Sequence, residues 1–250
     1  HREGGVPMGF FSSDGNRTLW SERLAVDTGI WFHVFSACLG KMMAVQTACS
    51  DQVVKGQDWN IDFEEGSIRF GTQKYPLQFI GSESTKSNTW LWGWENINGF
   101  SEEILRLADH TKEVGERWRL EALTTAEFRL NDTFSGHNLS IVTCGIAGNY
   151  CYYRGSHDGG AIFVAFSGVS DRIFAPVDVQ NFVSITTRCI QQFHIDHKIF
   201  TEGFLTWNNT KYEWSDQTLI AHFPQDLNIT FERVDNFLRI CSINSISSAS

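Results

Sequence analysis

The sequence has no run of about 18 consecutive apolar residues, the minimum that a transmembrane helix needs. The nearest approach, residues 29–45, is interrupted by His33, Ser36 and Lys41. It also lacks the charged lead and the small-residue cleavage site of a secretory signal. We therefore expect no membrane partner.

Clusters of basic residues are also missing. The 250 residues include 20 Lys and Arg against 29 Asp and Glu, so the formal net charge is −9. Sequence-independent binding to nucleic acid requires clustered Lys and Arg that displace counterions. DNA and RNA are therefore not expected partners, whereas an acidic surface would suit a basic protein.

The cysteines form no C-x-x-C pair, and scattered cysteines in a chain of this length are typical of reduced core residues in a cytoplasmic protein. They are Cys38, Cys49, Cys144, Cys151, Cys189 and Cys241. Five N-x-S/T sequons, the acceptor sites for N-glycosylation, favour a secreted protein instead. A sequence rich in Asn, Ser and Thr, however, produces such triplets by chance. Their asparagines are Asn16, Asn131, Asn138, Asn208 and Asn228. We predict a cytoplasmic protein.

Motifs for common enzyme chemistry are absent. There is no G-x-x-x-x-G-K-[ST] or G-x-G-x-x-G phosphate loop, and no H-E-x-x-H zinc motif. Ser167 is preceded by no Gly at the position that a nucleophile elbow requires. We expect no cofactor, and we favour a non-enzymatic protein over an enzyme.

The most informative stretch that is present spans residues 89–96, where Trp90, Trp92 and Trp94 recur at every second position. Side chains alternate between the two faces of a strand, so the three indoles are predicted to project from one face. Large aromatic side chains dominate core energetics, which favours a core face under a helix. The alternative is a stacking platform for a sugar, a base or a peptide.

The first part of the chain predicts a long helix followed by an antiparallel meander. Apolar residues dominate from about residue 24 to 53, with Lys41 and Gln46 among the few polar positions, so this helix should be buried on more than one face. Alternating patterns and turn residues then predict strands. They cover residues 59–63, 67–70, 75–81 and 89–96. A helix on such a meander is an α+β arrangement.

The middle of the chain mixes short elements. Residues 101–114 predict a helix that Gly115 ends, and residues 118–123 predict a short strand. A capping-box spacing over residues 124–127 predicts another helical piece. A helix at residues 135–147 and a hairpin of residues 150–154 with 161–167 follow.

The last part repeats the order of helix and meander. After a boundary at residues 171–176, a helix is predicted over residues 177–198. Five strands are predicted at residues 203–207, 211–214, 218–223, 228–233 and 237–243. The domain plan is therefore a leader or disordered segment (1–18), an α+β domain (19–170), a C-terminal helix plus meander (171–244) and a frayed tail (245–250). Two helix-plus-meander units suggest a cystatin-like or cone-like fold, by analogy alone.

Three segments resemble a family of uncharacterised bacterial proteins that is known as a domain of unknown function. They are Asp58-Trp59-Asn60, residues 81–96, and Tyr153-Arg154-Gly155-Ser156-His157-Asp158-Gly159-Gly160. The family typically shows W-x-W-x-W-x-N and Y-R-G-x-x-D-G-G, and the likeness covers about residues 20–170. The resemblance implies a bacterial, cytosolic α+β protein and brings no activity or catalytic residue with it.

Two other groups of side chains are candidates for a site. Arg154, His157 and Asp158 could line the rim of a pocket, although Ser156-His157-Asp158 cannot form a catalytic triad because successive side chains diverge. His194 and His197 would share one face of a helix and could supply two ligands to a metal ion. A third ligand would have to come from elsewhere, such as His222 or Glu202. Turn chemistry and helix-end polarity are the favoured explanations of the two groups.

These patterns favour a non-enzymatic, acidic protein-binding module, for example an immunity-like protein that neutralises a basic toxin. The alternative is a small-ligand binder or an enzyme with a Trp-lined pocket near Arg154, His157 and Asp158. Metal binding at His194 and His197 is the most remote possibility.

Overall fold

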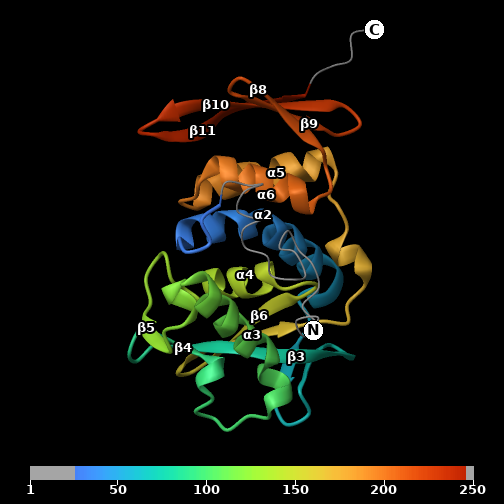
Figure 1. The fold of residues 1–250 in the computed structure, drawn as a ribbon. Helices are drawn as coiled ribbons and strands as arrows, with labels where there is room; N and C mark the ends of the chain where they lie inside the picture. The colour runs from blue at the N-terminus through green and yellow to red at the C-terminus, as the bar shows by residue number, and fades with distance from the viewer. Residues whose placement is uncertain (1–25, 246–250) are drawn as a thin grey trace.

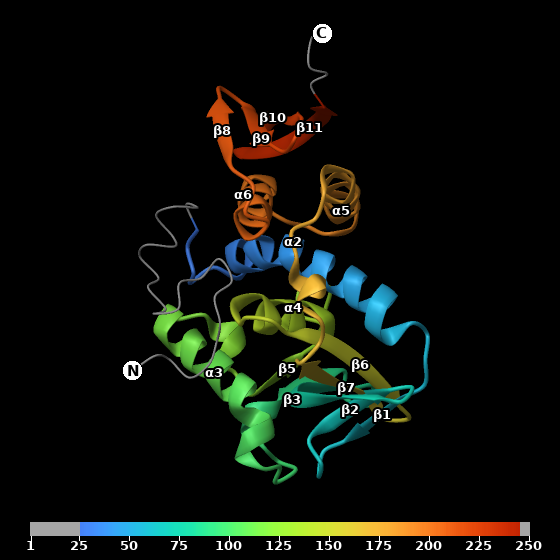
Figure 2. The same cartoon turned by 90° about the vertical axis from the view of Figure 1, so that its right-hand side faces the viewer.

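A computed structural model describes residues 26–245 and shows an α+β fold built in layers (Figure 1). A four-stranded C-terminal sheet lies above two helices, which lie on the long helix α2. Beneath α2 come helix α4 and a seven-stranded sheet, with α3 beside them (Figure 2). The helices are α2 (Trp31–Cys49), α3 (Glu102–Trp118), α4 (Gly136–Ile146), α5 (Val179–Gln192) and α6 (His197–Trp207).

Helix α2 occupies the middle of the molecule and is buried on most sides, as its apolar composition predicted. Close packing against α6 depends on glycine: a Cβ on Gly203 would lie 2.9 Å from the carbonyl oxygen of Ala37. The helix was predicted to start near residue 21, which was wrong for residues 26–30, where the Asp27 carboxylate accepts a hydrogen bond from the Gly29 amide and forms a turn. Residues up to 25 lie outside the described part of the chain.

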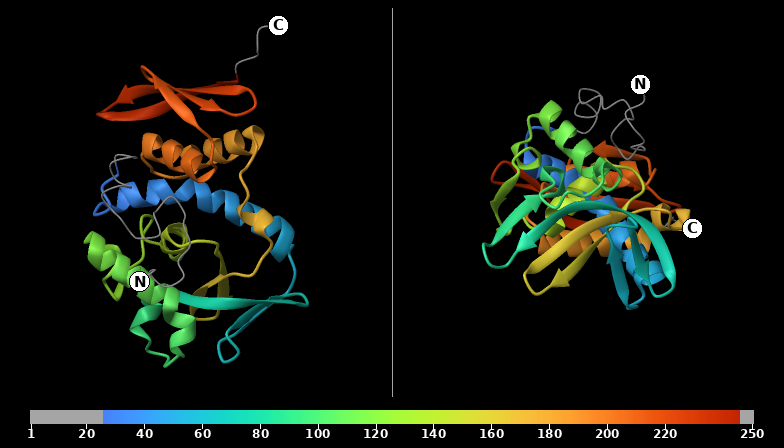
Figure 3. Two further views of the ribbon diagram at one scale, coloured as in Figure 1. Left: turned by 45° about the vertical axis from the view of Figure 1, so that its right-hand side comes forward. Right: turned by 90° about the horizontal axis from the view of Figure 1, so that it is seen from below.

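The predicted meander and the later hairpin are confirmed, and they form one antiparallel sheet. Strand β3 is long enough to pair with β2 through its first part and with β4 and β7 through its second. Seen from below, the strands spread beneath the helices (Figure 3). The strands are β1 (Trp59–Asp62), β2 (Ser67–Phe70), β3 (Gln73–Ser84), β4 (Thr89–Trp92), β5 (Glu127–Arg129), β6 (Cys151–His157) and β7 (Gly160–Phe166).

The elements between β4 and α4 differ from the prediction. Gly115 does not end α3, because it packs against Leu123 and the helix continues to Trp118. Arg119 then takes the left-handed conformation, with φ of 54°, that ends the helix. The predicted strand 118–123 was wrong because a 3-10 helix, Glu121–Leu123, follows, and the predicted helical piece at 124–127 leads instead into β5.

The C-terminal helix is broken where one helix was predicted over residues 177–198. Helix α5 ends at Gln192, and α6 begins after Asp196, whose carboxylate accepts a hydrogen bond from the Ile199 amide. Helix α6 also takes up residues 203–207, so the strand predicted there was wrong. The other four strands are confirmed: β8 (Tyr212–Ser215), β9 (Thr218–His222), β10 (Asp226–Val234) and β11 (Phe237–Ser245).

The predicted leader (1–18) lies outside the described residues, and so does the tail beyond Ser245. Within residues 26–245, every helix is too short or too polar to span a lipid bilayer.

Candidate functional site

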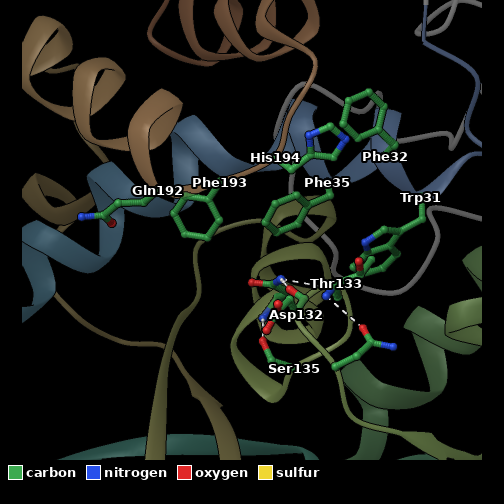
Figure 4. Close-up of a pocket in the computed structure, with 11 residues that line it drawn as sticks. Trp31, Phe32, Phe35, Asp132, Thr133, Ser135, Gln192, Phe193 and His194 are labelled. Carbon is green, nitrogen blue, oxygen red and sulfur yellow. Dashed lines mark hydrogen bonds between the residues drawn. The ribbon is translucent and has the colours of Figure 1, made fainter.

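A cavity of about 740 Å³ lies between the start of α2, the turn before α4 and the link between α5 and α6 (Figure 4). Small-molecule sites typically have volumes of ~300–1,000 Å³. Two of its three sides come from the part of the chain before residue 170, and the third comes from the C-terminal helices. The lining residues are Trp31, Phe32, Phe35, Asn131, Asp132, Thr133, Ser135, Asn138, Gln192, Phe193 and His194.

One wall of the cavity is aromatic. Trp31 and Phe35 are one helical turn apart on α2, and their rings stack with centroids 6.0 Å apart and planes 15° apart. Phe193, in the link after α5, extends this wall with its ring centroid 5.9 Å from that of Phe35. Phe32 stacks on His194 at 5.0 Å. The aromatic rings thus form two stacked pairs that present a broad apolar surface.

The opposite side of the cavity is a polar turn that its own side chains hold in place. The Asn131 carboxamide oxygen accepts hydrogen bonds from the backbone amides of Thr133, at 2.9 Å, and Phe134, at 2.8 Å. The Asn138 side-chain amide donates to the carbonyl oxygens of Asp132 and Thr133. Ser135 caps α4 by accepting from the Asn138 backbone amide. The turn is therefore formed before any ligand binds, which lowers the entropy cost of binding.

A smaller cavity of about 360 Å³ adjoins the same turn on its other side. Asn131 and Phe134 line it, together with Glu121, Ala122, Thr125, Phe128 and Arg129. Phe134 also contacts the ring of Trp31, with centroids 5.2 Å apart. The turn therefore separates two hollows in the surface, and the larger one carries the aromatic wall.

The tryptophan stretch lies elsewhere, and two of its three indoles are in the core. Trp90 and Trp92 are 0% and 1% exposed, and their rings meet edge to face at 5.3 Å. The strand ends at Trp92, so Trp94 was wrongly placed on the same strand face. Trp94 belongs to a 3-10 helix, where it is half-buried with the Lys112 ammonium 4.5 Å from its ring centroid.

Arg154, His157 and Asp158 are all exposed on the β6–β7 hairpin. The His157 ring accepts a hydrogen bond from the Gly159 amide at 3.1 Å, which is turn geometry. Arg154 lies near His137, and burial together with the Arg154 charge lowers the pKa of His137, against an opposing effect of Glu83. Neither of the two cavities is lined by these three residues or by Trp90, Trp92 and Trp94.

His194 and His197 do not share a helix face, because His194 lies in the link before α6 and His197 is the first residue of α6. The Nδ1 atom of His197 accepts a hydrogen bond from the Ile240 amide at 3.0 Å. Burial and the Arg239 charge lower the pKa of His197. Across residues 26–245, no three His, Cys, Asp or Glu side chains are grouped so that they could hold a metal ion.

Of the residues that line the larger cavity, the sequence prediction named only His194 as a site candidate, as a metal ligand, although signals for the others were present. Trp31, Phe32 and Phe35 crowd the first two turns of α2, and Asn131 begins a turn that Ser135 ends as a helix cap. What the sequence could not show is that Phe193 and His194 meet the start of α2, which lies more than 150 residues away along the chain.

The architecture and the cavity together define an α+β protein with a preformed hollow beside its central helix. The chain belongs to a family of unknown function (DUF6882), whose model matches residues 33–169. Among curated proteins and among solved structures, none matches this chain. The matched region contains most of α2 and the whole polar turn. The lining residues outside it are Trp31, Phe32, Gln192, Phe193 and His194.

Proposed function

We propose that this protein binds a small molecule in the cavity between α2 and the turn at residues 131–135. The observation that supports this function is the pairing of a continuous aromatic wall with a preformed polar turn across about 740 Å³. An apolar pocket with a few convergent polar groups is the usual form of a ligand site. The site differs in position from a pocket near Arg154, His157 and Asp158.

Filling the cavity should abolish binding without disturbing the core. Thr133 is exposed at the cavity, so Thr133→Trp adds an indole that occupies it. Ser215→Trp is the matched control, because Ser215 is exposed at the far end of the molecule on β8. We expect ligand-detected NMR with a fragment library to find binders of the wild type that Ser215→Trp retains and Thr133→Trp loses. A library without binders, or with binders that Thr133→Trp retains, would count against the cavity.

A second candidate function is a protein-binding module with a basic partner, such as an immunity-like protein of a bacterial competition system. The formal net charge of −9 favours it, and so does the crowding of carboxylates on α3. Burial, followed by the charges of Glu113 and Glu102, raises the pKa of Asp109 on that helix, with Lys112 opposing. A basic protein surface would relieve this repulsion.

A pull-down of the tagged protein from the lysate of its native host tests this second function. We expect a stoichiometric basic protein to be retained at low salt and released as salt rises, because screening weakens exposed charge pairs. The variant Glu102→Gln/Glu113→Gln should retain less of it, whereas Glu64→Gln/Glu232→Gln, at exposed sites off α3, should not. Equal retention by both double variants would remove α3 from the interaction.

A further inference from the structure

The charges that line the larger cavity restrict what it can hold. Among residues 26–245, Asp132 is the only carboxylate in its lining, and no Lys or Arg contributes to it. Phosphates and carboxylates are normally bound by Arg, Lys or the free amides of a helix start. At the start of α4, two backbone amides already have hydrogen-bond partners within the protein. The Gly136 amide donates to the Glu83 carboxylate at 2.6 Å, and the Asn138 amide donates to the Ser135 hydroxyl oxygen. The site is therefore not built for an anion.

The aromatic rings favour a flat surface over a cage. A cage for an organic cation requires ring faces that converge on one point. Here the ring planes of Trp31 and Phe35 lie within 15° of parallel, and those of Phe32 and His194 within 27°, so the rings of each pair do not converge on one point. The stacked rings form a platform, which suits a ligand that lays one apolar face along it.

The polar side offers groups that both donate and accept hydrogen bonds. Within residues 26–245, no protein partner engages the Asn131 amide nitrogen or the Thr133 hydroxyl. Carboxamides and hydroxyls provide donors and acceptors together. A sugar hydroxyl also donates and accepts, so neutral polyhydroxyl ligands match this set better than a ligand with one kind of group.

We propose, on the basis of the ligand-binding function above, that the ligand is a neutral saccharide. One face of its ring lies on the platform of Trp31 and Phe35, and its hydroxyls bond to Asn131 and Thr133. Asp132 adds a strong acceptor at the exposed end of the turn. The hydrogen bonds between the Asn131 and Asn138 side chains and the backbone of the turn hold these groups in position.

Saturation-transfer NMR tests this with the methyl glycosides of glucose, galactose, mannose and N-acetylglucosamine, beside choline and adenosine. We expect at least one glycoside to bind and its affinity to fall about tenfold or more in Trp31→Ala. Thr133→Val, which removes the hydroxyl at an exposed position and leaves the core intact, should also weaken it. Trp59→Ala is the control, because it removes a partly exposed indole at a distance from the cavity.

The outcomes separate this proposal from the function on which it rests. Binding of choline or adenosine that depends on Trp31, without binding of any glycoside, would overturn the saccharide and leave the cavity as a ligand site. No binding by any of the six compounds would also overturn the saccharide, and the fragment screen with Thr133→Trp would then decide the cavity itself. Glycoside binding that Trp31→Ala and Thr133→Val leave unchanged would place the glycoside outside the cavity and overturn the saccharide, and the fragment screen would again decide the cavity.

Discussion

Lys41→Met should lower the free energy of unfolding by about 3–5 kcal/mol, the largest effect that we expect from any single substitution of a polar residue here. Lys41 is 1% exposed in the middle of α2. Its ammonium donates to the carbonyl oxygens of Cys144, Gly145, Ala147 and Gly148 at distances of 2.9–3.3 Å.

The four carbonyls are the reason for this cost. They belong to the last turn of α4 and the residues after it, where a helix leaves its acceptors without internal partners. The negative end of the helix dipole also favours a cation there. Methionine fills similar space but cannot donate, so buried acceptors would lose their partners. Urea unfolding monitored by circular dichroism measures the change, with Lys86→Met as the control because Lys86 is exposed in the β3–β4 loop.

The pH dependence of the same variant gives a separate readout. Burial lowers the pKa of Lys41 from 10.5 to about 8, partly opposed by Cys38 and Cys144. Above pH 8 the unfolded chain therefore binds more protons at this residue than the native protein does, and the contribution of Lys41 to stability rises with pH. The difference between wild type and Lys41→Met should widen by up to about 1.4 kcal/mol per pH unit before levelling off near the unfolded value. Wild-type stability of the variant would mean that the carbonyls find other partners.

Lys41 also illustrates what the sequence could and could not predict. The apolar composition around it was sufficient to predict a helix buried on several faces, and α2 is such a helix. In that pattern, Lys41 was only one of a few polar positions, and nothing in it indicated that the side chain would be buried. Its role depends on carbonyl groups more than 100 positions away, at the end of another helix. Local periodicity carries no information about such a pairing.

The C-terminal half shows how local signals compete. The tight polar turns between β8 and β11 were sufficient to predict four strands correctly. The helix before them was predicted as one piece, because apolar residues continue through Phe193 and Ile195. The cap formed by Asp196 starts a new helix there, and α6 then continues through Phe204 into the segment that was predicted as a strand. As part of α6, Phe204 packs closely on α2: a Cβ on Gly40 would lie 2.5 Å from the Phe204 ring. This tertiary contact favours the helix over the strand that local signals predicted.

The candidate cavity was beyond sequence-based prediction for a related reason. Its polar turn could be predicted locally, from an Asn that starts a turn and a Ser that caps a helix. Its aromatic wall is assembled from α2 and from Phe193 in the broken helix. A prediction that joins α5 and α6 into one helix removes the link that provides Phe193 and His194. The cavity therefore depends on the element that was predicted incorrectly.

Trp92→Ala should cost about 3–5 kcal/mol, the usual cost of truncating a buried Trp. Trp92 is 1% exposed, and its indole nitrogen donates to the Ala122 carbonyl oxygen at 2.9 Å. It thereby ties β4 to the segment that leads into β5. Trp94→Ala is the matched control and should cost about 1–2 kcal/mol, because Trp94 is half-buried and its cation–π contact with Lys112 is near the surface. Chemical denaturation of both variants gives the comparison, and a cost below about 1 kcal/mol for Trp92→Ala would contradict its place in the core.

Replacement by Phe separates hydrogen bonding from packing at the two buried tryptophans. Within residues 26–245 the Trp90 indole nitrogen is buried without a hydrogen-bond partner, whereas that of Trp92 has one. Trp92→Phe loses the bond and leaves the Ala122 carbonyl without that donor, at a cost of about 1–3 kcal/mol beyond the lost volume. Trp90→Phe removes an unsatisfied buried donor, which offsets part of its cavity cost. We therefore expect Trp90→Phe to be the milder variant in the same denaturation series. The reverse order would mean that ring volume, rather than the indole N–H, sets the stability of this layer.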